Sequence, residues 1–245
     1  MAHPMVAVLD EAVRQVRGKG ETLGERLRLI ADLVREKGPE FAVQVDRFVG
    51  RLEETRAGSA APQVGEPMPH FTMPDQNGRL TTLSEFLEQG PVVIAYHRGH
   101  WCPYCRLNMA ALAEVEDRVL PAQIIGISAE VQEYTRKMKE DAGGRYPILT
   151  DINAGYALSL NLAIWVDQQM SAMIEGAGWD IPLYQGGEAW ILPIPSVFVV
   201  DQDGIIVARH VDPDYRRRME LDALLRGVDL VRGDPVAPVS RAQQV

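Results

Sequence analysis

A short apolar stretch followed closely by two cysteines is the feature that most limits how this chain can fold. Residues 92–96 (VVIAY) are apolar, and most are β-branched or aromatic, which is typical of a strand buried in a sheet covered on both faces. Cys102 and Cys105, the two cysteines of the chain, come next. Apolar residues then recur at helical spacing as far as Val119. The stretch therefore predicts a strand, a short loop and a helix, with both thiols at the carboxyl end of the strand.

Cys102 is expected to be the N-cap of that helix. Pro103 suits the first helical position because its φ is fixed and it has no N–H group to leave unpaired. The free amides and the positive dipole end of a helix favour an anion at its start, and Cys-x-x-Cys thiols at such positions have pKa values of roughly 3.5–7.5. We predict an exposed attacking thiol of low pKa at Cys102 and a shielded resolving thiol at Cys105. The alternative, that both cysteines are only buried packing residues, is less favoured because they share one motif.

Charge and length narrow the class of protein. With 245 residues, 46% of them hydrophobic, the chain can form one domain core and an accessory segment. Its formal net charge of −9 argues against nucleic acid or an anionic membrane as a partner, and its apolar runs are too short to span a bilayer. No secretory signal follows Met1, and a reversible cysteine pair suits a reducing compartment, so we expect a cytoplasmic protein.

The N-terminal region reads as a helical extension. Residues 5–57 have helical periodicity, with a break at Gly38 and Pro39. Their apolar faces are expected to pack on the main domain, on each other or on a second subunit, which leaves a homodimer open. We divide the chain into a helical extension with a linker (residues 1–60), a main domain (61–230) and a loose C-terminal tail (231–245).

The main domain alternates strands and helices. Alternation of this kind predicts parallel strands covered by helices, and a late antiparallel hairpin makes the sheet mixed. The fold class is therefore α/β, with three layers and a central mixed sheet. The expected elements are a hairpin over 71–81, helices over 84–87, 131–141 and 216–230, strands over 123–128 and 146–150, and a hairpin over 196–208.

Together with the predicted hairpin over 71–81, five segments of the main domain resemble the alkyl hydroperoxide reductase/thiol-specific antioxidant (AhpC/TSA) family. They are 65–71 (GEPMPHF), 96–105 (YHRGHWCPYC), 148–151 (ILTD), 190–195 (WILPIP) and 199–204 (VVDQDG). The segments look most like the peroxiredoxin-like branch with a Trp-Cys-Pro-Tyr-Cys motif, over about residues 64–228. The resemblance implies a thioredoxin-like fold and a thiol-dependent peroxidase that needs no metal or other cofactor. Its substrate would be hydrogen peroxide or an organic hydroperoxide, and thioredoxin, glutaredoxin or glutathione would reduce the Cys102–Cys105 disulfide.

The resemblance and the helix geometry disagree about which sulfur attacks. Peroxiredoxins carry Thr or Ser three residues before the peroxidatic cysteine, so in that register Cys102 stands where the hydroxyl would be and Cys105 is peroxidatic. In thioredoxins and glutaredoxins the first cysteine attacks. We predict Cys102, on the geometry of the helix cap.

Arg98 is the preferred supporting residue, because a guanidinium stays charged, favours a thiolate and can hold a peroxide oxygen. A salt bridge from Arg98 to a carboxylate is an equal alternative. The rest of the motif, Trp101, Pro103 and Tyr104, completes the immediate surroundings of the thiols. The aromatic segment around Trp165, Trp179, Tyr184 and Trp190 is expected to form a lid or a dimer contact.

Two residues later in the chain are also candidates for the site. Pro195 is expected to be the cis-proline that faces the thiols in thioredoxin-like folds, with Pro193 as the competing position. Arg209 follows the second hairpin strand and is expected either to point back to the thiols or to lie on the surface.

Two other functions stay open from the sequence. Cys-Pro-Tyr-Cys without the expected Thr fits a thiol–disulfide oxidoreductase of the thioredoxin or glutaredoxin type. A non-enzymatic zinc module is a weaker alternative, since His97 and His100 add ligands of the right type to the two cysteines.

Overall fold

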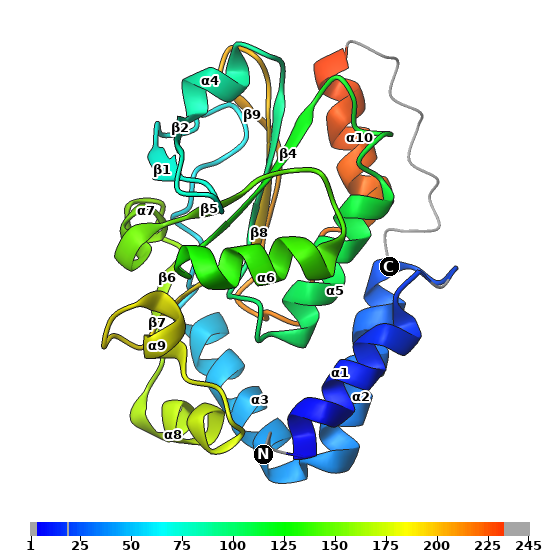
Figure 1. Cartoon of the computed structure of the whole chain (residues 1–245), viewed down its shortest axis with the longest axis vertical. Coiled ribbons are helices and arrows are strands. Elements are labelled where there is room, and N and C mark those ends of the chain that lie inside the picture. Colours follow the sequence, from blue (N-terminus) through cyan, green and yellow to red (C-terminus); the bar gives the residue numbers. More distant parts are fainter. Residues whose placement is uncertain (1–3, 19, 233–245) are drawn as a thin grey trace.

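The computed structural model describes residues 4–18 and 20–232 (Figure 1). The predicted loose tail lies outside the described residues from position 233 onward. None of the described helices is long and apolar enough to cross a membrane.

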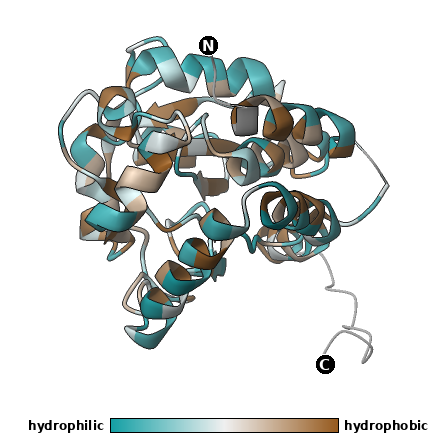
Figure 2. Cartoon of the chain, turned by 90° about the horizontal axis from the view of Figure 1, so that it is seen from below, coloured by the Kyte–Doolittle hydropathy of each residue, from teal (hydrophilic) through white to brown (hydrophobic). Residues whose placement is uncertain are grey.

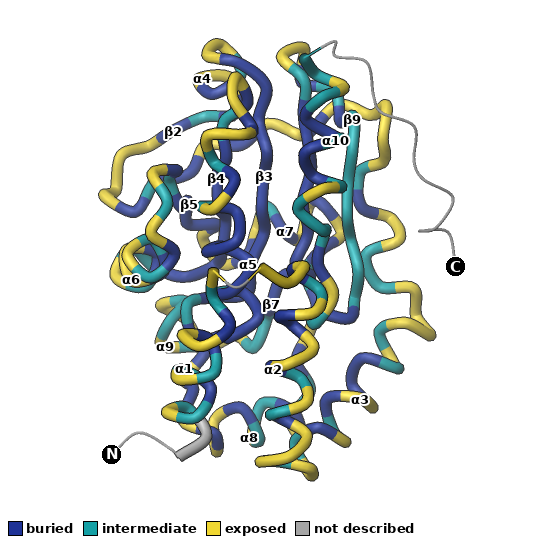
Figure 3. The backbone as a smooth tube through the Cα atoms, turned by 90° about the vertical axis from the view of Figure 1, so that its right-hand side faces the viewer, coloured by how far each residue is buried: buried dark blue, intermediate teal, exposed yellow. Residues whose placement is uncertain are grey.

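The core of the molecule is a five-stranded mixed sheet, as the sequence predicts. Its strand order is β5-β4-β3-β8-β9, with β3 parallel to β4 and antiparallel to β8. All five residues of β3 are buried, and the strand is dark blue along its length in Figure 3. The strands are β3 (Val92–Tyr96), β4 (Gln123–Ser128), β5 (Ile148–Thr150), β8 (Ser196–Val200) and β9 (Ile206–Val211).

Helices cover the sheet on one side. Helix α5 (Pro103–Glu114) contacts α6 (Gln132–Ala142), and α10 (Leu221–Arg232) packs on β8 and β9. In Figure 1, α5 and α10 stand to the right of the strands. Because α5 begins where the central strand β3 ends, its N-terminus lies in the middle of the sheet, at the carboxyl end of β3.

Shorter elements cover the other side. Strands β1 (Thr72–Pro74) and β2 (Leu80–Thr82) form the expected hairpin, and the Oδ1 atom of Asp75 accepts hydrogen bonds from the backbone in its turn. Gly78 has a φ of 86°, a conformation that favours glycine. The hairpin leads into α4 (Leu83–Leu87), while the short η1 (Ile152–Ala154) and α7 (Gly155–Ser159) follow β5.

Three helices precede the main domain, and two of them pack on the helix that carries the cysteines. The three are α1 (Pro4–Val16), α2 (Leu23–Lys37) and α3 (Pro39–Glu54), so the predicted helical region also breaks at 17–22. Helices α1 and α2 contact each other and α5. The buried guanidinium of Arg26 in α2 reaches Glu114 of α5 with nitrogen–oxygen distances of 2.8 and 3.2 Å. In Figure 2 the teal, hydrophilic residues lie mainly on the outer faces of the helices.

An insertion between β5 and β8 completes the wall around the carboxyl end of β3. It contains the antiparallel pair β6 (Ala163–Trp165) and β7 (Ile191–Pro193), with α8 (Gln168–Gly176) and α9 (Ile181–Gln185) between them. Helix α8 contacts α3 of the same chain. The insertion and the N-terminal extension therefore meet over the same end of the sheet (Figure 1).

The final helix begins later than the sequence pattern suggests. The predicted helix covers 216–230, but α10 starts at Leu221. Asp214 is the cause, because its carboxylate accepts from both the backbone N–H and the Nε of Arg216, at 3.1 and 2.8 Å. Short polar side chains that bond the nearby backbone in this way compete with helix formation. Residues 215–218 therefore precede the helix, and of these Tyr215 and Arg218 lie at the thiol site.

Candidate active site

The thiols lie at the junction of β3 and α5, where the sequence places them. Cys102 has extended backbone angles (φ −85°, ψ 114°) and is the N-cap of α5, and Pro103 takes the first helical turn. The Cys102 carbonyl accepts from Arg106 N–H at 3.0 Å, which starts the helical ladder. The Cys102 sulfur therefore sits at the positive end of a twelve-residue helix.

Both thiols are fully buried, which corrects one prediction. Cys105 is shielded as expected, but the exposed fraction of Cys102 is also 0%, so the prediction of an exposed attacking sulfur is wrong. The physical reason lies in the long-range packing: Arg98, Trp101 and Tyr215 gather at this end of the sheet, and α1–α3 close over them. A helix cap is usually open to solvent, but here the extension removes that opening.

Arg98 makes direct contact with the thiols. Its Nη2 donates to Cys102 Sγ at 3.4 Å, and its backbone N–H donates to Cys105 Sγ, also at 3.4 Å. The guanidinium lies 3.5 Å from the Tyr215 ring centroid and 5.1 Å from that of Trp101. Within the described part of the chain no carboxylate forms an ion pair with Arg98, so of the two alternatives the structure has the thiol contact.

Arg218 is a second cation at the site, and the sequence analysis missed it. Its Nη2 lies 3.5 Å from Cys105 Sγ, and its Nη1 donates to the Arg217 carbonyl at 2.7 Å and to the Tyr215 carbonyl. The only sequence signal is the run Tyr215-Arg216-Arg217-Arg218. The predicted helix over 216–230 included its three arginines, so the pattern offered no reason to place one of them at the thiols. The turn at Asp214 aims Arg218 inward.

The two sulfurs differ in acidity. Burial opposes ionisation of Cys102, but a hydrogen bond from Cys105 and the charges of Arg98 and Arg218 outweigh it, so the Cys102 pKa lies well below its usual value. Burial, together with the hydrogen bond and charge of Cys102, holds the pKa of the Cys105 thiol well above its usual value. The pair therefore favours a Cys102 thiolate beside a neutral Cys105 thiol, and which sulfur attacks the substrate stays a prediction.

Pro195 is not the expected cis-proline, and of the two alternatives for Arg209 the structure excludes the one that points it at the thiols. Among the described residues the one cis peptide bond is Leu120–Pro121, so the bonds before Pro193 and Pro195 are trans. The chain runs extended from β7 into β8 here, with Ile194 N–H bonded to the Leu162 carbonyl at 2.7 Å, and a trans bond continues that path.

Arg209 points away from the thiols. Its Nη1 donates to the carbonyls of Ala61 and Pro62, at 3.0 and 2.9 Å. Its position on β9 opposite Phe198 sends the side chain toward the segment that follows the N-terminal helices. Arg218, nine residues later, is the arginine that reaches the site.

The two histidines before the motif do not join the cysteines in a metal site. His97 is fully buried, neither of its ring nitrogens has a hydrogen-bond partner among the residues that the structure describes, and burial lowers its pKa to about 3, so it is neutral. His100 instead pairs with the buried carboxylate of Glu130, with Nδ1 at 2.7 Å from Oε1. No cluster of three or more potential ligands occurs in the part of the chain that the structure describes.

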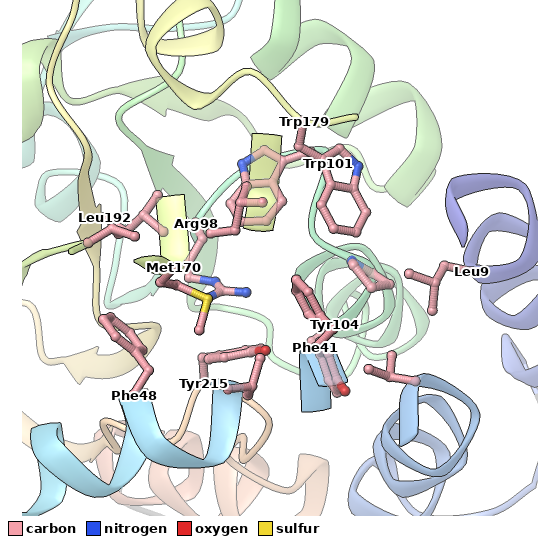
Figure 4. Close-up of a pocket in the computed structure, with 15 residues that line it drawn as sticks. Leu9, Phe41, Phe48, Arg98, Trp101, Tyr104, Met170, Trp179, Leu192 and Tyr215 are labelled. Atoms are coloured by element: carbon pink, nitrogen blue, oxygen red, sulfur yellow. The ribbon is translucent and has the colours of Figure 1, made fainter. Parts of the chain in front are cut away.

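An apolar cavity adjoins Arg98 and the motif aromatics. Its free volume is about 30 Å³, close to the space that one water molecule occupies. In Figure 4 Arg98 projects among Trp101, Trp179 and Tyr215, with the ring centroids of the two tryptophans 5.6 Å apart. The remaining walls are apolar residues of the extension and the insertion, namely Leu9, Val34, Phe41, Val45, Phe48, Val166, Met170, Ile174 and Leu192, with Pro103 and Tyr104 from α5.

The aromatic residues of the insertion divide between this cavity and the surface. Trp179 is buried against Trp101, whereas Trp165 has an exposed fraction of 66%. Tyr184 packs on the His100 ring, with centroids 4.9 Å apart. The insertion therefore covers the motif loop within one chain, and a contact with a second subunit stays a prediction.

Comparison with known proteins agrees with this geometry. The model of the AhpC/TSA family matches residues 64–209. No curated protein matches the sequence. Among solved structures, peroxidoxin BcpB from Mycobacterium tuberculosis is similar with a TM-score of 0.54 at 20% identity, covering 69% of this chain and 98% of that one.

Two further structures give the same fold. Yeast mitochondrial 1-Cys peroxiredoxin has a TM-score of 0.52 at 18% identity and covers 70% of this chain and 76% of its own. Peroxiredoxin 6 of Arenicola marina, solved as a cysteine-to-serine mutant, has a TM-score of 0.54 at 17% identity and covers 70% of this chain and 74% of its own. The matches establish a peroxiredoxin-like fold, and the helices α1–α3 lie outside the matched family region.

Proposed function

Since the chain belongs to the AhpC/TSA family, we propose that it is a thiol-dependent peroxidase that works through a Cys102–Cys105 disulfide. One observation carries the proposal. A buried arginine stands 3.4 Å from the sulfur whose pKa is lowered, so one guanidinium both stabilises the thiolate and offers donors to a peroxide oxygen.

The reaction follows from this arrangement. The Cys102 thiolate attacks the terminal peroxide oxygen, the O–O bond breaks, and the peroxide's own proton goes to the leaving oxygen, which departs as water or an alcohol. Arg98 donates to the oxygens as negative charge moves across them. The Cys102 sulfenate takes up a proton from solvent, and the Cys105 thiol then attacks the Cys102 sulfur, so that the S–S bond forms, the S–O bond breaks and the oxygen leaves as water with the Cys105 proton. No metal or organic cofactor takes part in these steps.

The surroundings favour a small or apolar substrate over a protein. Both sulfurs have an exposed fraction of 0%, which leaves no surface on which a folded protein's disulfide could reach them. The cavity beside Arg98, of about 30 Å³, has room for a substrate about the size of hydrogen peroxide, and its lining is apolar. A thiol–disulfide oxidoreductase, the second candidate, rests on the Cys-Pro-Tyr-Cys motif alone. We place the reaction in the cytoplasm, where thiol donors keep such a pair reduced.

The test is stopped-flow oxidation of the prereduced protein by hydrogen peroxide and by cumene hydroperoxide, compared with its reduction of hydroxyethyl disulfide. We expect rapid stoichiometric loss of peroxide and slow disulfide turnover. Slow peroxide loss with fast disulfide turnover would transfer the assignment to the oxidoreductase.

Mass spectrometry after one equivalent of hydroperoxide identifies the attacking sulfur. We expect oxygen on Cys102 in the Cys105→Ser variant, little oxygen in Cys102→Ser, and a Cys102–Cys105 bond in the wild type. Oxygen on Cys105 in Cys102→Ser, with none in the other variant, would reverse the roles.

A further inference from the structure

A large cleft lies between the N-terminal ends of α2 and α10, and the reaction above does not use it. Its volume is about 840 Å³. That volume falls within the usual range for sites that bind small molecules. Its basic lining residues are Arg26, Arg118, Arg209, Arg218, Arg226 and His210.

The cleft concentrates unneutralised positive charge in an acidic protein. Arg26 is paired with Glu114. The other four arginines have no carboxylate within ion-pair distance among the residues that the structure describes. Three carboxylates also line the cleft: Glu220 accepts from the Gly24 N–H at 2.8 Å, while Glu21 and Asp222 are exposed. A chain of net charge −9 thus presents a cleft that favours an anion.

Arg218 connects this cleft to the thiol pair. It lines the cleft, is only 8% exposed, and its Nη2 lies 3.5 Å from Cys105 Sγ. Its Nε and the Nε2 of His210 are buried and have no hydrogen-bond partner among the described residues. Unused hydrogen-bonding groups at the inner end of a cationic cleft indicate a polar ligand that is seated against Arg218, the lining residue that contacts Cys105.

The chemistry of the pair decides what such a ligand would do. When a thiol cleaves a disulfide, the sulfur with the lower pKa is the better leaving group. Cys102 is that sulfur, because it is the N-cap of α5 and its Sγ accepts from the Arg98 guanidinium at 3.4 Å. Attack on the disulfide is therefore favoured at Cys105, the sulfur that Arg218 joins to the cleft.

We propose that the arginine cleft binds a small thiol that carries carboxylate groups, and that this thiol reduces the Cys102–Cys105 disulfide by attack on Cys105. The proposal rests on the proposed function, in which that disulfide is the product of peroxide reduction. It names the class of electron donor and the surface through which the donor enters.

The exchange balances with two donor molecules. The first donor thiol loses its proton and attacks Cys105 Sγ, the S–S bond breaks, and Cys102 leaves as the thiolate with the bonding electrons. A second donor thiolate attacks the donor sulfur of the mixed disulfide, and Cys105 leaves and takes up a proton. Two donor thiols become one disulfide while the protein disulfide becomes a thiol and a thiolate.

Binding is measured first, with a probe that cannot react. S-methylglutathione, which carries two carboxylates and no free thiol, is titrated into the reduced full-length protein by calorimetry. We expect saturable binding that weakens about tenfold in the Arg118→Gln/Arg226→Gln variant, because two unpaired charges are lost. Arg79→Gln, which removes an exposed arginine from the β1–β2 hairpin and not from the cleft, is the matched control and should bind like the wild type.

Reduction is then measured on protein whose disulfide has been formed with diamide, so that the result does not depend on peroxidase activity. Glutathione is compared with its diethyl ester, which has the same thiol but no free carboxylates, after correction for thiolate content. We expect the wild type to favour glutathione at least tenfold, and the double variant to lose most of that preference while the ester rate stays within about twofold. Arg79→Gln should keep the preference.

Two outcomes overturn the proposal while leaving the peroxidase assignment intact. Equal rates for glutathione and its ester in the wild type would show that the cleft does not select an anionic donor. Binding of S-methylglutathione that is identical in the wild type and the double variant would place the site elsewhere. If the stopped-flow peroxide assay fails while the binding and reduction measurements give the expected results, the peroxidase step is wrong and the donor site stands.

Discussion

At the scale of single residues, Arg98 is one of three groups, with Cys105 and Arg218, that lower the pKa of Cys102. Arg98 reaches Cys102 through its guanidinium and Cys105 through its backbone amide, so its side chain can be removed without changing how the main chain holds Cys105. The sequence could point to Arg98 because it is close in the chain, but not to Arg218, which lies 113 positions from Cys105. Only the turn that Asp214 imposes brings that second arginine inward.

Removing the Arg98 charge should raise the Cys102 pKa. In Arg98→Gln the opposing effect of burial is less compensated, so less thiolate exists at pH 7, and we expect peroxide oxidation to slow at least tenfold. A raised thiol pKa means that the rate recovers as pH increases. Iodoacetamide alkylation followed from pH 4 to pH 10 measures the shift, with Arg79→Gln as the control. An alkylation profile that does not move would show that Arg98 has no part in stabilising the thiolate.

Gly99 is the residue at which the loop before the motif tolerates least change. Its φ is +150°, and a methyl group added there would lie 2.5 Å from both Glu130 Oε1 and Trp101 Nε1. We expect Gly99→Ala to destabilise the protein by about 2–4 kcal/mol and to slow peroxide oxidation, because Trp101 and the buried Glu130 must shift. Urea denaturation measures the first effect. Gly155→Ala, where the added methyl meets nothing within 4 Å, is the control, and equal losses in both variants would contradict the steric explanation.

At the scale of elements, the sequence pattern predicted those helices and strands whose bounds depend on residues nearby in the chain. Strand β4 lies over the predicted residues 123–128, and α5 begins at Pro103 as its fixed φ suggests. The predictions failed where a distant segment decides: Cys102 is buried because α1–α3 close over it, and α10 starts late because Asp214 holds Arg216. The three N-terminal helices were visible as periodicity, but nothing in that periodicity says that they pack on the cysteine helix.

The contact between α2 and α5 gives an asymmetric prediction. Arg26 is 2% exposed and Glu114 is 35% exposed, so removing the acid leaves a buried guanidinium unpaired, whereas removing the arginine leaves a carboxylate that water can reach. We expect Glu114→Ala to destabilise by about 3 kcal/mol and Arg26→Met by clearly less, since the methionine fills the same apolar space. Urea denaturation orders the two. Lys137→Ala, in an exposed pair with Glu133, should change stability by less than about 0.5 kcal/mol, and the reverse order of the first two variants would refute the burial argument.

At the scale of the whole molecule, the extension and the insertion jointly build the substrate side of the site. Phe41 of α3 stands between the 30 Å³ cavity beside Arg98 and a neighbouring cavity of about 280 Å³. Access to the thiols thus depends on helices that neither carry the thiols nor belong to the matched family region.

Removing the Phe41 side chain, which stands between the two cavities, should change selectivity between substrates. In Phe41→Ala the two cavities merge, and we expect kcat/KM for cumene hydroperoxide to rise at least fivefold relative to that for hydrogen peroxide, because the larger substrate gains room while the smaller one needs none. Leu29→Ala, at an exposed position of α2, serves as the control. Equal changes for both substrates would mean that the cavity does not receive the organic group.

The packing of α1 and α2 on α5 limits how far this protein can be shortened. A fragment trimmed to residues 64–209 would expose the outer surface of the cysteine helix to water and would discard Tyr215 and Arg218 with the C-terminal strand-to-helix turn. The segment that matches the family model is therefore smaller than the segment that the folded protein needs.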